Sequence, residues 1–140
     1  MNKPPHSIIL PRPLVNDLLM AAQLTPDKEI CGLIASNPAG HPVRHYPIRN
    51  CAKTPQTHYR MDAGEQIRAF KTMRDRGETL FGIYHSHPKG PDHPSLTDIR
   101  EAEYRDAIYF IISMNTKGVL ELGAFRIMED DFLSLPLVIT

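Results

Sequence analysis

The sequence from Leu80 to Glu103 is LFGIYHSHPKGPDHPSLTDIREAE. Its first five residues, Leu80–Tyr84, are largely apolar and aromatic, which predicts a buried strand that runs up to the histidines. Because residues two apart on a strand point to the same face, His85 and His87 are expected on one face, with Cα atoms about 7 Å apart. Ser86 then faces the other way. Two imidazoles at this spacing can reach a single metal ion.

A third ligand is predicted from the residues that follow. A strand cannot continue through the prolines and the glycine of residues 88–94, so the chain must loop before Ser95–Asp98 opens a helix with an N-cap signature. This return brings the Asp98 carboxylate towards the two histidines. Two histidines and one carboxylate are a ligand set of catalytic zinc, because a structural site normally closes the tetrahedron with a fourth protein ligand, usually Cys. The open position would carry water, whose pKa zinc lowers to about 7.

The same residues, together with Glu29 at the start of an apolar segment, resemble the JAMM (MPN+) metallopeptidases. The pattern of that family is a glutamate on an early strand, then His-x-His-Pro, then Ser-x-x-Asp. This chain has Glu29, His85–Pro88 and Ser95–Asp98 in that order. The similarity extends from the first predicted helix to about Ile127. It implies an α+β fold with a mixed, largely antiparallel sheet flanked by helices, similar to that of the cytidine deaminases.

The resemblance also implies a role for each of these residues. His85, His87 and Asp98 are the implied ligands of one Zn²⁺. Glu29 is the implied general acid/base on the metal-bound water, and Ser95 is the implied donor to the tetrahedral intermediate. The expected reaction is amide hydrolysis, in which zinc polarises the scissile carbonyl and Glu29 moves a proton from water to the leaving amine.

Each residue also has a purely structural interpretation. An isolated His on a strand is more often structural or exposed than a ligand. Ser95 and Asp98 can form a capping box, in which each side chain bonds the backbone N–H of the other, and taken alone this interpretation is favoured. Glu29 can be a solvated residue after a turn, because its local spacing does not indicate an approach to the histidines. No role is assigned to the other five histidines, His6, His41, His45, His58 and His93.

Composition limits the class of protein. A chain of 140 residues fits one domain, predicted to cover residues 1–140, and can bury a core without disulfides. The 16 basic and 16 acidic side chains balance, so no overall field favours nucleic acid or an anionic membrane. No segment has the roughly 18 continuous apolar residues of a transmembrane helix, and no signal-peptide pattern occurs. We therefore expect a cytoplasmic protein with two free thiols, Cys31 and Cys51.

The pattern between the motifs predicts one α+β unit without internal repeats. Helices are predicted over Pro11–Gln23, after an Asp62 cap, and over Leu96–Arg105. Apolar runs predict strands over Ser7–Leu10, Ile30–Ser36, Val43–Arg49, Ala107–Met114 and Val119–Ile127, with Tyr59–Met61 as a candidate addition. Turns are predicted at Asn37–Gly40 and Asn115–Gly118. The apolar tail Phe132–Thr140 is expected to pair with the sheet or with another molecule.

The resemblance further implies a substrate class. Cleavage is expected at the C-terminal tail of a ubiquitin-like protein, bound as an extended strand. The loop between His87 and Asp98 has no large insertion, so the chain is more similar to prokaryotic members, some of which process sulfur-carrier proteins of the ThiS/MoaD type. Release of cysteine or another adduct, or trimming of a precursor, is the expected task. A cell-wall or phage-tail peptidase and a metal-free scaffold are the alternatives. A zinc deaminase is disfavoured, because His-x-Glu and Pro-Cys-x-x-Cys do not occur.

Overall fold

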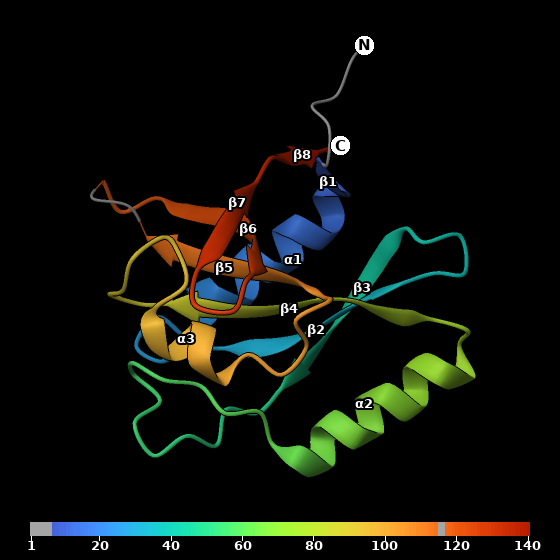
Figure 1. The fold of residues 1–140 in the computed structure, drawn as a ribbon, viewed down its shortest axis with the longest axis horizontal. Helices are drawn as coiled ribbons and strands as arrows, with labels where there is room; N and C mark the ends of the chain where they lie inside the picture. Colours follow the sequence, from blue (N-terminus) through green and yellow to red (C-terminus); the bar gives the residue numbers. More distant parts are fainter. Residues whose placement is uncertain (1–6, 115–116) are drawn as a thin grey trace.

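The computed structural model describes residues 7–114 and 117–140 as a central sheet with helices on both faces (Figure 1). The strands of the main sheet are β2 (Cys31–Ser36), β3 (Pro42–Ile48), β4 (Thr79–His87), β5 (Ile108–Met114), β6 (Leu120–Ile127) and β7 (Phe132–Leu135). Two short strands, β1 (Ile8–Leu10) and β8 (Leu137–Ile139), pair separately. The helices are α1 (Arg12–Leu24), α2 (Ala63–Asp75) and α3 (Leu96–Glu101).

The six strands of the main sheet lie in the order β3-β2-β4-β5-β6-β7. Every neighbouring pair is antiparallel except β4 and β5, which run parallel with α3 in the connection between them. A parallel pair needs such a crossover, because a tight hairpin can join only antiparallel strands. The predicted α+β class, with a mixed and largely antiparallel sheet, is confirmed. In the described part of the chain, no helix is long and apolar enough to cross a membrane.

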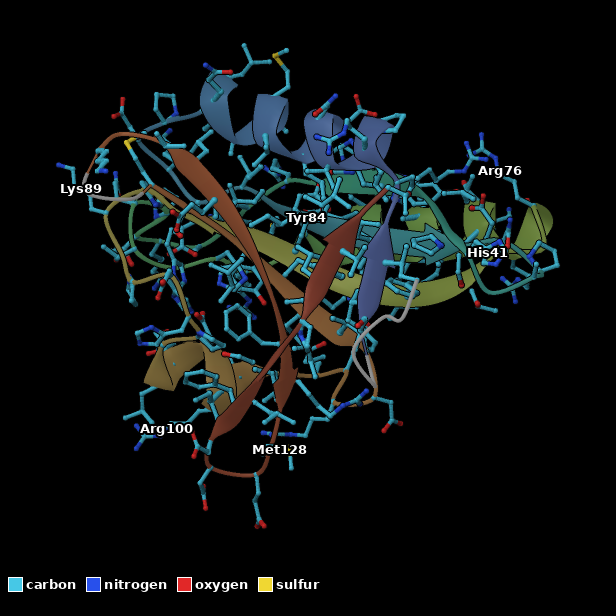
Figure 2. The ribbon with its side chains drawn as sticks, turned by 90° about the horizontal axis from the view of Figure 1, so that it is seen from above. His41, Arg76, Tyr84, Lys89, Arg100 and Met128 are labelled. Carbon is cyan, nitrogen blue, oxygen red and sulfur yellow. The ribbon has the colours of Figure 1, made fainter. Side chains whose placement is uncertain are left out.

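Two apolar layers form the core, one on each face of the sheet. On one face, Leu14 and Leu18 of α1 pack with Tyr84 and Phe110 of the sheet. The opposite face packs α2 and α3 against the sheet through residues that include Met73, Ile83, Ile99 and Tyr109. Figure 2 shows α1 and α3 on opposite sides of the sheet, with Tyr84 on the side of α1. The central strands are therefore buried on both faces, which explains their nearly continuous apolar sequences.

Gly32 permits a close approach that holds β2 and β4 together. A Cβ atom there would lie 2.4 Å from the carbonyl oxygen of Tyr46 and 2.5 Å from the ring of Tyr84. The Tyr84 hydroxyl crosses to β3, where it lies 2.9 Å from Nδ1 of His45. Only glycine leaves room for this ring, and its contacts maintain the register in which Cys31 pairs with His85.

Most predicted elements are confirmed to within one or two residues, but two differ. The predicted helix Leu96–Arg105 ends at Glu101, because Ala102 is extended and the Arg105 guanidinium turns back to donate to the carbonyl of Ile99. Tyr59–Met61 forms no strand. Met61 forms an isolated bridge with Asn50, and the backbone N–H of Arg60 donates to the Asn50 side chain.

The remaining predictions concern the ends and turns of the chain. The expected pairing of the tail with the sheet is confirmed, because β7 pairs with β6. The rest of the tail, β8, pairs in parallel with β1. Part of the predicted turn at Asn115–Gly118 lies outside the described residues, as does His6. The two cysteines are free thiols, Cys31 buried and Cys51 exposed.

Candidate metal centre

The last residues of β4 bring two imidazoles together. His85 and His87 are only 0% and 5% exposed, and their Nε2 atoms lie 3.0 Å apart. The side chain of Ser86, between them, makes a different contact. Its hydroxyl accepts a hydrogen bond from the backbone N–H of Ile30 at 2.9 Å. The alternation expected from a strand therefore directs both histidines into one site.

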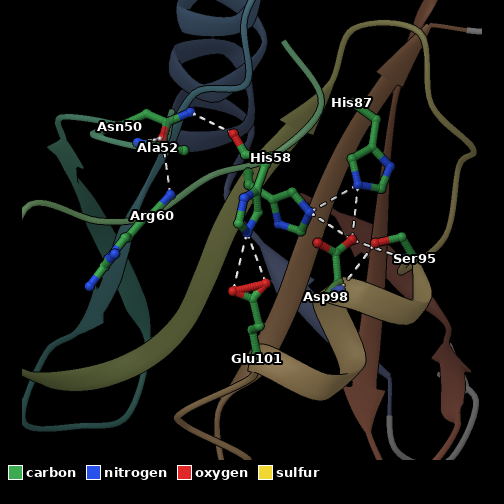
Figure 3. Close-up of polar contacts among 9 residues, drawn as sticks. Asn50, Ala52, His58, Arg60, His87, Ser95, Asp98 and Glu101 are labelled. Carbon is green, nitrogen blue, oxygen red and sulfur yellow. Dashed lines mark hydrogen bonds and ion pairs between the residues drawn. The ribbon is translucent and has the colours of Figure 1, made fainter. Parts of the chain in front are cut away.

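Asp98 reaches the histidines from the first turn of α3. Its Oδ2 atom lies 3.1 Å from Nε2 of His85 and 3.0 Å from Nε2 of His87 (Figure 3). The same oxygen accepts a hydrogen bond from the backbone N–H of Ser95 at 2.9 Å, and the Ser95 hydroxyl accepts one from the N–H of Asp98 at 3.0 Å. The capping box thus fixes the carboxylate against the two imidazoles.

The loop between β4 and α3 orients His87. Nδ1 of His87 lies 2.6 Å from the carbonyl oxygen of Pro91, which can only accept, so Nδ1 carries a proton. In a neutral imidazole Nε2 then presents its lone pair to the site. Such a carbonyl partner on the outer nitrogen is the usual support of a metal-binding histidine.

His85 is held by packing on an aromatic ring. The ring of Tyr59 stacks on it with centroids 4.4 Å apart and an angle of 26° between the planes. Burial lowers the pKa of His85, which favours the neutral imidazole. Its Nδ1 atom is buried without a hydrogen-bond partner among the residues that the structure describes.

Glu29 lies directly before β2 and faces the same centre. Ligand atoms of Glu29, His85 and His87 all lie within 4.8 Å of one another. The Glu29 side chain is buried, and its Oε1 has no hydrogen-bond partner in the described part of the chain. Burial raises the pKa of this carboxyl to about 7. A carboxylate that titrates near neutral pH is suited to accept and return a proton.

The donor atoms fit a zinc ion. Tetrahedral zinc with bonds of about 2.0–2.1 Å needs donors about 3.3 Å apart, and the three atoms of His85, His87 and Asp98 are 3.0–3.1 Å apart. Burial works against ionisation of Asp98, but hydrogen bonds from both histidines hold its pKa well below the usual range. Burial also opposes protonation of His87, yet its bonds to Asp98 and the Pro91 carbonyl raise its pKa. The centre thus favours a positive charge, which a divalent cation would supply in place of a proton.

A comparison with protein families matches residues 11–126 to the model described as prokaryotic homologs of the JAB domain. This chain belongs to that family. The resemblance drawn from its motifs is therefore confirmed. The matched span includes Glu29, both histidines and Asp98.

Curated relatives of this JAB-domain chain include named peptidases. It is 36% identical over 126 residues to the CysO-cysteine peptidase of Mycobacterium tuberculosis strain H37Rv, covering 89% of this chain and 85% of the relative. It is also 36% identical over 132 residues to the probable TtuB-protein conjugate cleaving protease of Thermus thermophilus, covering 93% and 84%.

Solved structures show the same JAB fold. A protein from Desulfitobacterium hafniense superposes with a TM-score of 0.81 at 31% identity, covering 95% of this chain and 93% of that one. A JAB1/MPN domain protein from Archaeoglobus fulgidus superposes with a TM-score of 0.53 at 16% identity, covering 94% and 99%. The second likeness concerns the fold alone.

Beside the metal centre, the JAB domain has a cavity of about 570 Å³ that extends along Asp98. Residues 58–61, the start of α2 and the helix α3 are among the parts of the chain that line it. His58 crosses from this segment to α3, where its Nε2 lies 2.8 Å from Oε2 of Glu101 (Figure 3). The cavity therefore opens on one side of the candidate ligands.

The structure brings together the five residues singled out from the sequence, which are Glu29, His85, His87, Ser95 and Asp98. Sequence reasoning missed Asn50, His58 and Tyr59, which belong to the centre through tertiary contacts. No local pattern marks them. His93, to which the sequence assigned no role, stacks on Phe132 with centroids 5.4 Å apart.

Proposed function

We propose that this chain is a zinc-dependent peptidase that hydrolyses the bond at the C-terminal tail of a ubiquitin-like or sulfur-carrier protein. The observation that carries the proposal is the convergence of three donor atoms, on His85, His87 and Asp98, beside the buried carboxylate of Glu29, whose Oε1 has no hydrogen-bond partner among the described residues. Two histidines and a carboxylate leave one zinc position for reactants, as catalytic sites require. The proposal treats residues 1–140 as one metallopeptidase domain.

The residues divide the reaction between them. Zinc, when bound to His85, His87 and Asp98, supplies Lewis-acid polarisation of the scissile carbonyl and lowers the pKa of water in the site. Glu29 takes the proton from the attacking water and delivers it to the leaving amine, a transfer for which its raised pKa of about 7 is well placed. The buried walls around Glu29 keep bulk water from competing for this proton.

Ser95 is proposed to donate to the oxyanion that develops during attack. Its hydroxyl oxygen accepts a hydrogen bond from the backbone N–H of Asp98, so the O–H group can still donate a hydrogen bond elsewhere. A serine can therefore cap α3 and stabilise the oxyanion at once. The position beside a ligand, Asp98, supports this double role.

The names of the relatives support the substrate class. One is a peptidase of a CysO-cysteine adduct, and another is a probable protease of TtuB-protein conjugates. We propose the same kind of substrate here, a sulfur carrier of the ThiS/MoaD type joined through its C-terminal glycine to cysteine or to another amine. The cavity beside Asp98 would hold substrate residues next to the scissile bond.

The test uses zinc-loaded protein and two defined substrates. In one, cysteine is joined to the C-terminal glycine of a sulfur carrier by a peptide bond; in the other, a lysine side chain is joined there by an isopeptide bond. We expect mass spectrometry to show release of the intact carrier by the wild type and none by Glu29→Gln, with one zinc per chain in both. Cleavage of a cell-wall peptide but of neither carrier conjugate would favour the alternative peptidase. A chain that binds no metal and cuts none of these would contradict the proposal.

A further inference from the structure

Glu29 lies outside the hydrogen-bond ladder of β2, which begins at Cys31. Its backbone is held instead by the segment that follows β3. The N–H of Glu29 donates to the carbonyl of Pro55 at 2.7 Å, and its carbonyl accepts from Nδ2 of Asn50 at 3.0 Å. The orientation of the proposed acid/base therefore depends on a loop and one amide side chain.

Asn50 uses the full hydrogen-bonding capacity of its carboxamide, and Figure 3 shows its bonds to His58 and Arg60. Nδ2 donates to the carbonyls of Glu29 and His58, each at 3.0 Å. Oδ1 accepts from the N–H groups of Ala52 and Arg60, again at 3.0 Å each. An amide has two donor hydrogens and two acceptor lone pairs, so every one is occupied by backbone.

These four bonds connect both sides of the metal centre. The bonds to His58 and Arg60 enclose Tyr59, whose ring stacks on His85 at 4.4 Å. The bond to Glu29 holds the backbone carbonyl of the residue that carries the proposed acid/base. One side chain thus sets the position of the acid/base and of the ring that supports a zinc ligand.

We propose that Asn50 is a positioning residue for catalysis, which acts by fixing the backbone of Glu29 and of the Tyr59 loop. This inference rests on the proposed function. Asn50 touches neither the candidate ligand atoms nor the reacting groups, so it acts through its neighbours. A displacement of about 1 Å in a reacting group can lower turnover about 100-fold.

The kinetic test compares Asn50→Ala with Asn37→Ala. Asn37 is a matched control, because its Oδ1 also accepts two backbone N–H groups, those of Ala39 and His41, but in the β2–β3 turn at the far end of β2. We expect Asn50→Ala to lower kcat about 100-fold with little change in KM and one zinc per chain, and Asn37→Ala to keep wild-type kcat. An unchanged kcat in Asn50→Ala would overturn the proposal.

A double-mutant cycle tests whether Asn50 acts through Glu29. Glu29→Asp retains a carboxylate on a shorter stem and serves as the second change. If Asn50 positions Glu29, the double variant should be much less impaired than the product of the two single losses. Independent, multiplying losses would show that Asn50 does not act through Glu29.

Hydrogen exchange tests the positioning without substrate. Asn50→Ala should raise amide exchange roughly tenfold or more at Glu29, Ala52 and Arg60, and leave β5 unchanged. Asn50→Asp retains the acceptors and lacks the donors, so it is expected to raise amide exchange at Glu29 more than at Ala52. This second variant keeps the inference testable if Asn50→Ala does not fold. Wild-type exchange at Glu29 in both variants would refute the inference. Wild-type protein that cleaves no conjugate would refute the proposed function alone, and the exchange result would still decide the role of Asn50.

Discussion

At the scale of single residues, Ser95 combines two roles that one substitution can separate. Ser95→Ala removes both the cap and the O–H donor, whereas Ser95→Gly removes the donor and keeps most of the capping, since glycine at an N-cap loses only a few tenths of a kcal/mol. If Ser95 donates to the oxyanion, both variants should lose about 10²- to 10³-fold in kcat. Steady-state kinetics of the zinc-loaded variants provide the measurement. Full turnover in Ser95→Gly would leave the serine with the cap alone.

A second prediction at the scale of single residues concerns the effect of Glu29 on the stability of the metal-free protein. Its pKa is about 7 in the fold against an ordinary 4.5, so the folded state binds more protons than the unfolded chain between these values. Ionisation of Glu29 therefore destabilises the fold as pH rises through this window. Glu29→Gln carries no charge, so we expect it to be more stable than the wild type above pH 7, by the order of 3 kcal/mol.

This advantage should shrink towards zero as pH falls below about 4.5, where Glu29 is protonated in both states. Urea unfolding of both metal-free proteins at several pH values measures the difference, in which the contributions of titrating groups distant from Glu29 cancel. A difference that does not change with pH would contradict the raised pKa of this buried carboxyl.

At the scale of elements, the contact between β2 and β4 decides whether the site assembles. Gly32→Ala would place a methyl group 2.4 Å from the carbonyl oxygen of Tyr46, which is backbone and cannot move away. We expect a loss of about 2 kcal/mol or more in the free energy of unfolding, as for other overpacked cores. Gly64→Ala is the matched control, because its new methyl group would meet neighbours at 3.5 Å in the first turn of α2.

Gly64→Ala should raise stability by about 0.4–1 kcal/mol, since alanine restricts the unfolded chain and favours a helix. Chemical denaturation of both variants tests the pair. Equal effects of the two substitutions would show that the crossing of Tyr84 over β2 is not tightly packed.

At the scale of the whole molecule, zinc should couple the site to global stability. A ligand that binds only the folded state stabilises it by about 2.7 kcal/mol at 100 times its Kd. We therefore expect zinc to raise the Tm of the wild type, and to leave the Tm of His87→Ala unchanged. His41→Ala, a change at an exposed turn residue, should respond as the wild type does. Calorimetry with and without zinc is the measurement, and a similar zinc response in His87→Ala would remove His87 from the ligand set.

Much of the molecule follows from local sequence. The helix after Asp62 begins where its cap predicts, and the capping box of Ser95 and Asp98 opens α3. The end of α3 could not be predicted in the same way. Its last turn is replaced by a bend in which Arg105 reaches back to the carbonyl of Ile99, a contact between the following loop and α3 that helix propensity does not encode.

By itself the sequence determined the direction of side chains within one element: His85 and His87 point to one side because a strand alternates, and Asp98 faces back because a capping box bends its carboxylate towards the helix start. Only the tertiary structure decided how Glu29 meets them. The register that pairs Cys31 with His85 continues through the bond between Ser86 and Ile30, and so brings Glu29 to the level of His87. The physical reason is that periodicity acts over a few residues, whereas the pairing of β2 with β4 joins residues 56 positions apart through packing of the whole sheet.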